Sequence, residues 1–123
     1  MELIRVNIDS VMPSNEFAKE IKDIIIDAGK TGLLFKGYVP TIISPVGKIT
    51  SYELIFDYYI DPIGYSFETI EADSGVLSYL KFNGIKELIE KHDDDDEGFC
   101  GFCPVRTGPS NRLSEILLVF ANC

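Results

Sequence analysis

The sequence contains one histidine, three cysteines and no tryptophan among its 123 residues. A Ser–His–Asp or Cys–His catalytic set would therefore depend entirely on His92. Neither a Walker motif nor a GxGxxG glycine pattern is present, and we do not expect an enzyme. The cysteines are odd in number and lie in the last quarter of the chain, whereas a secreted disulfide framework usually has an even count. We therefore expect a reduced, cytoplasmic protein.

Long hydrophobic runs are also missing. The longest ones, "DIIIDA" and "ILLVFA", are far too short to cross a bilayer. The opening "MELIRVNIDS" has no apolar stretch after a basic one, so it does not predict a secretory signal. Hydrophobic residues at 46% and charged residues at 25% are ordinary for a globular protein. The length is typical of one domain, and we expect residues 1–123 to form a single acidic unit.

Positive charge is scarce in the middle of the chain. The net charge is −9, and residues 51–97 carry thirteen acids against three bases, whereas residues 1–50 are balanced and residues 98–123 carry a net +1. Such a segment repels nucleic-acid phosphates and anionic membranes, and it attracts basic proteins. A basic protein is therefore the expected partner, with no nucleic acid and no membrane.

Two regular elements are predicted at the start. Residues 2–9 alternate in hydrophobicity and predict a strand. Residues 13–29 place five apolar side chains at helical spacing on one face: Phe17, Ile21, Ile24, Ile25 and Ala28. Ser14 or Asn15 can cap the first turn of this helix, and Gly29 can take the left-handed position at its end.

Strands dominate the middle of the chain. Breaks are expected at residues 37–40, 44–48 and 61–64, and the last of these suits a type I turn that closes a hairpin. Residues 73–92 predict a helix, with a strand followed by a turn at Asn83–Gly84 as the alternative.

The end of the chain predicts a loop from residue 93 to about 112 and a closing strand at residues 114–122. We find no internal repeat and no linker. This order predicts an α+β domain with a mostly antiparallel sheet of five or six strands and two helices on one face.

The stretch "KHDDDDEGFCGFC" raises four alternatives: a calcium site, a zinc site, a redox motif and a solvated loop. The acidic run imitates half of an EF-hand loop, but the twelfth position is Pro104, which has no side-chain oxygen, so calcium is excluded. The Cys–x–x–Cys spacing suits zinc, and one Cys₃His set would use His92, Cys100, Cys103 and Cys123. A redox role is disfavoured because the upstream acids raise thiol pKa values and no helix follows. We favour a solvated loop at Asp93, Asp94, Asp95 and Asp96, with no cofactor.

Residues 51–61 form the most unusual predicted strand. One side places Tyr52, Leu54, Phe56, Tyr58 and Ile60 toward a core. The other side alternates acids with apolar or aromatic residues and is the predicted partner-binding face: Glu53, Ile55, Asp57, Tyr59 and Asp61. The expected hairpin adds Glu68 or Glu71 beside this face. The alternative is that a helix covers the apolar members.

Three functional hypotheses follow. The first is a small inhibitor of a basic protein, comparable to an immunity protein for a nuclease toxin or to a DNA-mimicking inhibitor, acting through the face above and residues 93–96. The second is a zinc-stabilised interaction module. The third is a small enzyme that holds a phosphorylated substrate with Arg106 and Arg112, although the segment around them reads more simply as a turn.

Overall fold

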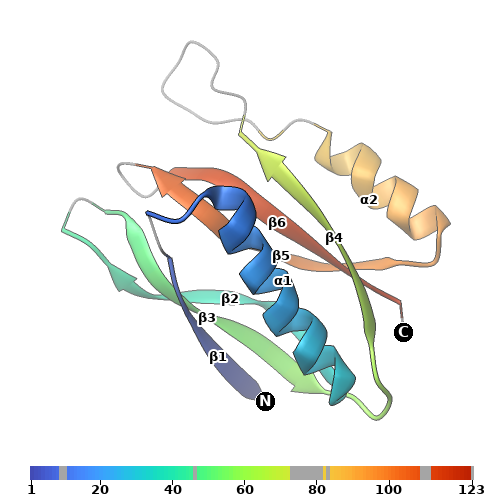
Figure 1. Ribbon diagram of the computed structural model, residues 1–123. Coiled ribbons are helices and arrows are strands. Elements are labelled where there is room, and N and C mark those ends of the chain that lie inside the picture. The colour runs from blue at the N-terminus through green and yellow to red at the C-terminus, as the bar shows by residue number, and fades with distance from the viewer. Residues whose placement is uncertain (9–10, 46, 73–81, 83, 109–111, 123) are drawn as a thin grey trace.

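The computed structural model describes all residues except 9–10, 46, 73–81, 83, 109–111 and 123, and only the backbone of residues 107–108 and 112–114. Figure 1 shows the elements in chain order: β1 (Glu2–Asn7), α1 (Ser14–Lys30), β2 (Leu33–Ile43), β3 (Ile49–Tyr58), β4 (Gly64–Glu71), α2 (Ile85–Asp94), β5 (Gly98–Gly108) and β6 (Arg112–Asn122). No helix among the described residues is long and apolar enough to cross a bilayer.

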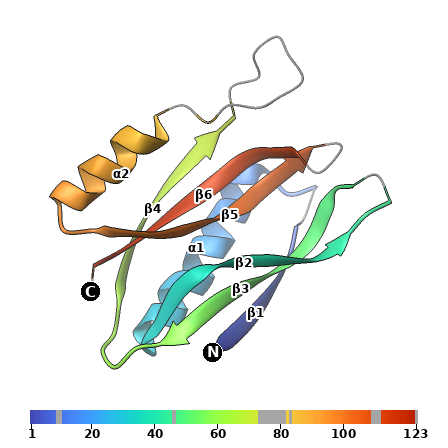
Figure 2. The ribbon, with the colours of Figure 1, turned by 180° about the vertical axis from the view of Figure 1, so that it is seen from behind.

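The strands form two antiparallel three-stranded sheets. Sheet A has the order β1-β3-β2, and sheet B has the order β4-β6-β5. The α+β class with mostly antiparallel pairing is therefore confirmed, but the strands do not form one sheet. The edge strands β2 and β5 run beside each other where the two sheets meet (Figures 1 and 2).

The connection between β3 and β4 does not close a hairpin, contrary to the prediction. Strand β4 pairs with β6 in sheet B and does not pair with β3. The connection is held by the end of α1, because Tyr59 N–H donates to Gly32 O and Ile63 N–H donates to Gly29 O. Glu68 and Glu71 are consequently not neighbours of the β3 face in a shared sheet, so their predicted place beside that face is wrong.

Helix α1 confirms the predicted apolar face but not the predicted caps. Four of its five predicted core side chains are buried, and Ile24 is partly buried. The N-cap is Pro13, with no side-chain hydrogen bond, and the helix continues past Gly29 to Lys30, with Thr31 as its C-cap. The left-handed position belongs to Gly32, at φ +80°. Gly29 instead allows close packing, since a Cβ there would lie 2.6 Å from Ile63 O and 2.7 Å from the Tyr65 ring.

Gly29→Ala is expected to destabilise the protein, although alanine is the better helix former. The intrinsic helix gain is about 1 kcal/mol, but the new Cβ would collide with backbone oxygen, and relieving that overlap costs about 2 to 3 kcal/mol. Chemical denaturation should therefore show a net loss. Gly64→Ala is the matched control, because a Cβ at Gly64 meets nothing within 4 Å, and equal stability of the two variants would contradict the packing role.

The hydrophobic side chains form two separate clusters. The larger one joins α1, one face of sheet A and one face of sheet B. The smaller one joins α2 to the opposite face of sheet B. The expectation that both helices pack on one face is not confirmed, because residues 116–120 of β6 are buried on both sides of the sheet.

The two halves of the chain repeat the same architecture, contrary to the expectation of no internal repeat. Each half is β-α-β-β, and in each sheet the third strand lies between the first two. Adding 64 to the pair Phe35–Phe56 of sheet A gives the pair Phe99–Phe120 of sheet B. The same offset turns Ile4–Leu54 into Glu68–Leu118.

Backbone irregularities repeat with the same offset. The bulges after Phe35 and Phe99 contain Gly37 at φ 142° and Gly101 at φ 144°, and the turns after the helices contain Gly32 at φ 80° and Asp96 at φ 61°. The short motif Phe–x–Gly–aromatic–x–Pro at residues 35–40 and 99–104 is the sequence trace of this repeat.

The predicted boundaries in the second half need correction. Residues 98–108, expected within a loop, form β5, since the glycine bulge lets the strand continue. Likewise β2 continues through the break predicted at residues 37–40. Helix α2 begins after Gly84, which agrees with the predicted break there, and the helix or strand predicted at residues 73–81 lies outside the described residues. The closing strand is confirmed as β6.

Candidate functional site

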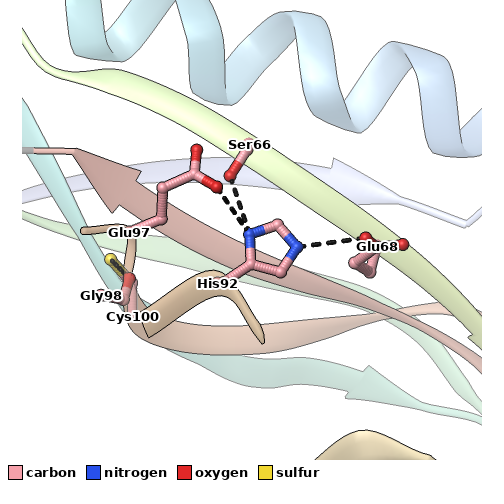
Figure 3. A network of polar contacts seen from close by, with 6 residues as sticks. All are labelled: Ser66, Glu68, His92, Glu97, Gly98 and Cys100. Carbon is pink, nitrogen blue, oxygen red and sulfur yellow. Dashed lines mark hydrogen bonds and ion pairs between the residues drawn. The ribbon is translucent and has the colours of Figure 1, made fainter. Parts of the chain in front are cut away.

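His92 lies in the last turn of α2, against the ring of Phe120 in β6. The two ring centroids are 3.7 Å apart and the planes differ by 6°, so the rings stack. Only 8% of His92 is exposed. Stacking and burial fix the plane of the imidazole and direct both ring nitrogens along the surface of sheet B (Figure 3).

Each nitrogen of this ring lies within hydrogen-bond distance of a glutamate carboxylate. Nδ1 lies 2.8 Å from Glu97 Oε1, and Nε2 lies 3.1 Å from Glu68 Oε1 (Figure 3). A third oxygen, Ser66 Oγ, lies 3.4 Å from Nδ1. A carboxylate oxygen can only accept, so a hydrogen bond to either glutamate needs the ring N–H at that nitrogen as its donor. We call Ser66, Glu68, His92 and Glu97 the His92 cluster.

Three elements position the cluster. Ser66 and Glu68 alternate along β4 and share the face on which α2 packs. Glu97 follows the turn that ends α2, where Glu97 N–H donates to His92 O at 2.8 Å. The backbone of this turn therefore holds the carboxylate close to the ring that it binds.

The contacts argue against a nucleophile activated by His92. A base must present a bare nitrogen to the hydroxyl that it deprotonates. Here Nδ1 makes its short contact with Glu97, and the Ser66 hydroxyl is the more distant partner. The geometry fits a polar clamp between α2, β4 and the following turn.

The fold itself does not require this cluster. The positions equivalent to Glu68, His92 and Glu97 in the first half are Ile4, Ala28 and Leu33, all of which pack in or against the apolar core. One half thus builds the same architecture without polar groups at these positions. The sequence prediction missed the cluster because it assigned Glu68 to the binding face and His92 to zinc.

The predicted zinc ligands are only partly described. Cys103 is fully buried, Cys100 is partly buried with its thiol 3.6 Å from Gly98 O, and neither forms a disulfide. Cys123 lies outside the described residues. In the part of the chain that the structure does cover, no three His, Cys, Asp or Glu side chains are grouped to hold a metal ion. The complete Cys₃His set stays a prediction.

Burial controls the chemistry of Cys103. It raises the pKa of this thiol from 9.0 to about 12, while a smaller contribution from a hydrogen bond with Tyr52 lowers the pKa. Burial also raises the pKa of Tyr52, whose hydroxyl donates to Pro104 O at 2.7 Å. At neutral pH Cys103 is therefore a protonated core side chain rather than a thiolate.

The predicted acids of β3 have basic neighbours on the outer face of sheet A. Glu53 Oε1 lies 3.3 Å from Arg5 of β1, and Asp57 Oδ2 lies 4.0 Å from Lys36 of β2. Ile55, between them, is half-buried and belongs to neither core cluster. This face is thus charge-balanced along its centre.

The end of β3 and the residues after it form an exposed aromatic and acidic segment, residues 57–61. Tyr58 is 69% exposed, Tyr59 45% and Ile60 96%, and they are flanked by the exposed carboxylates of Asp57 and Asp61. The prediction placed Tyr58 and Ile60 in the core, which is wrong because the strand ends at Tyr58. Tyr59, Asp57 and Asp61 are as accessible as the binding hypothesis needs.

The remaining predicted residues lie elsewhere. Glu71 is exposed at the end of β4. Asp93, Asp94, Asp95 and Asp96 are all exposed, as expected of a solvated run, but the loop predicted from residue 93 begins later, because α2 continues to Asp94. Arg106 is exposed on β5, and the side chain of Arg112 lies outside the described part.

Comparison with protein-family models, with curated proteins and with solved structures finds no match. Function therefore has to be argued from the residues and their geometry.

Proposed function

We propose that this chain is a cytoplasmic binding protein that neutralises a basic protein partner, as immunity proteins do for nuclease toxins. The observation that carries the proposal is segment 57–61, where three large apolar or aromatic side chains stand exposed in succession between two aspartates. Tyrosine and large apolar anchors surrounded by charge are the residues from which binding hot spots are built.

Electrostatics support a cationic partner. Thirteen of the twenty acids lie within residues 51–97, and the exposed run Asp93–Asp96 belongs to that stretch. A protein that must hold nucleic acid has a basic active site, and an acidic binder approaches it faster than a neutral one does. The carboxylates then contribute mainly to the association rate, and the aromatic anchors to the lifetime of the complex.

The experiment is to measure binding between the purified chain and the purified product of the adjacent gene. Tyr58→Ala combined with Ile60→Ala should weaken binding at least 30-fold, about 2 kcal/mol, because both side chains lose contact area at a hot spot. Asp57→Asn combined with Asp61→Asn should mainly slow association, and higher salt should do the same.

Val11→Ala is the matched control, since Val11 is 91% exposed but lies far along the chain from segment 57–61. This variant should bind within twofold of the unmodified chain. Absence of a salt-sensitive complex would refute the proposed function. Equal affinity of the Tyr58/Ile60 double variant would refute the role of the segment.

A further inference from the structure

The outer face of sheet A is a sheet surface on which no described helix packs. Figure 2 shows β1, β2 and β3 in front, with α1 behind them. Apolar residues on this face include Leu3, 47% exposed, Val39, 43% exposed, and the half-buried Ile55, and none of these three belongs to either core cluster. Leu3 is the direct partner of Ile55, so the two lie side by side.

The internal repeat identifies what covers the equivalent face in the other half. The positions equivalent to Leu3, Ile55 and Val39 are Phe67, Val119 and Cys103, which lie in or against the larger core cluster. That cluster contains the apolar face of α1, and Gly29 of α1 packs directly on Tyr65 of β4. An amphipathic helix therefore covers this face in sheet B.

The dimensions of the uncovered face suit the same kind of element. Three strands about 4.8 Å apart span about 10 Å, which is the width of one helix with its side chains. Along the edge of the face runs a groove of about 250 Å³ between β2 and β5, lined in part by Leu34, Lys36 and Cys100. A helix on the face would border this groove with one row of its side chains.

Resting on the proposed function, we infer that the partner docks an amphipathic helix on the outer face of sheet A, as α1 docks on the equivalent face of sheet B. The helix would place an apolar stripe over Leu3, Ile55 and Val39. Its basic side chains would meet Glu53 and Asp57. The pairs Arg5–Glu53 and Lys36–Asp57 do not prevent this, because they are solvent-exposed on the basic side and such pairs contribute little.

The charges on this face also distinguish its occupant from α1 itself. In sheet B the positions equivalent to Glu53 and Asp57 are Leu117 and Ala121, both buried. Helix α1, with four acids and three lysines, carries a net charge of −1 and suits that apolar surface. A helix for sheet A needs the same stripe with lysine or arginine on its flanks.

The test uses a synthetic peptide of residues 14–30 that carries Glu20→Lys, Asp23→Lys and Asp27→Lys. These three acids lie on the solvent side of α1, so the apolar stripe is kept while the flanks become basic. The peptide is titrated into the ¹⁵N-labelled full chain. We expect amide shifts centred on Leu3, Ile55 and Val39, and binding at least tenfold tighter than that of the unsubstituted peptide.

Ile55→Lys should weaken peptide binding at least tenfold, and Leu3→Lys gives a second variant at a more exposed position if the first disturbs folding. Val11→Lys should leave binding unchanged. Shifts located elsewhere, or unchanged affinity in both face variants, would overturn the inference. If the adjacent gene product binds the chain but ignores both variants, the proposed function stands and the helix site fails. If the peptide binds this face but the adjacent gene product binds nowhere, the proposed function fails.

Discussion

His92→Ala is expected to lower the free energy of unfolding by about 2 to 3 kcal/mol. The substitution removes the ring that stacks on Phe120. It also leaves the carboxylates of Glu68 and Glu97 without the imidazole that both of them contact. Their side chains are 34% and 25% exposed, so water compensates only part of the loss. Urea denaturation followed by circular dichroism measures the difference.

Lys91→Ala is the matched control, because Lys91 precedes His92 on the same helix and is exposed. It should change stability by less than about 0.5 kcal/mol. If both variants are equally stable, the His92 cluster does not hold α2 to sheet B.

The internal repeat supplies a sharper version of this experiment. Glu68→Ile, His92→Ala and Glu97→Leu together copy the apolar residues found at the equivalent positions of the first half. Replacing a buried charged group by well-packed apolar side chains is often neutral or stabilising, so the triple variant should recover most of the loss. A triple variant less stable than His92→Ala would mean that the second half cannot use the packing of the first.

Stability should fall steeply in alkaline solution because of the buried Cys103. In the unfolded chain its thiol loses a proton near pH 9.0, whereas the folded protein keeps that proton until about pH 12. Between these values the unfolded state binds fewer protons, so the free energy of unfolding decreases as pH rises. One such group contributes at most about 1.4 kcal/mol per pH unit, and about 2 kcal/mol between pH 9 and 11, because the thiol of the unfolded chain is only half deprotonated at pH 9. Tyr52, whose pKa is also raised by burial, adds to the decrease above pH 10.

The variant Cys103→Ala isolates this effect when its unfolding is measured from pH 8 to 11. At pH 8 its free energy of unfolding is expected to be lower than that of the unmodified chain. Between pH 9 and 10, however, its free energy of unfolding should fall less steeply, because the variant lacks the one thiol proton that the folded chain retains and the unfolded chain loses. Cys100→Ala should keep the full slope, since Cys100 is only partly buried. Parallel curves for the unmodified chain and Cys103→Ala would contradict the assignment.

Local hydrophobic patterns predicted those helices and strands whose conformation follows mainly from their own sequence. The face of α1 and the strands β1, β3 and β6 follow from hydrophobic spacing alone. The run of apolar residues at 116–121 also indicated a strand buried on both faces, and it therefore contained the information that α1 and α2 lie on opposite sides of sheet B. The prediction of one helix-covered face did not use it.

What could not be predicted depends on contacts between distant segments. The connection after β3 contains a good turn sequence, yet the chain leaves sheet A there, because the end of α1 binds Tyr59 and Ile63 through their backbone N–H groups. Likewise, Glu68 and Glu97 converge on His92 only because β4 and the turn after α2 meet on sheet B. The repeat was hidden for a related reason: apolar residues of the first half became polar ones in the second.

The two glycine bulges, at Gly37 and Gly101, have a consequence for how the halves are joined. A Cβ at Gly101 would lie 3.8 Å from Gly37 Cα, so the two bulges lie close together where β2 runs beside β5. Neither glycine is needed for space, because 3.8 Å is an ordinary contact distance and a Cβ at Gly37 would meet nothing within 4 Å. Glycine is needed for the backbone itself, since φ is 142° at Gly37 and 144° at Gly101, a conformation that other residues rarely adopt. Any other residue at either position would strain its own bulge, and that strain would act on the pair of strands that joins the two halves.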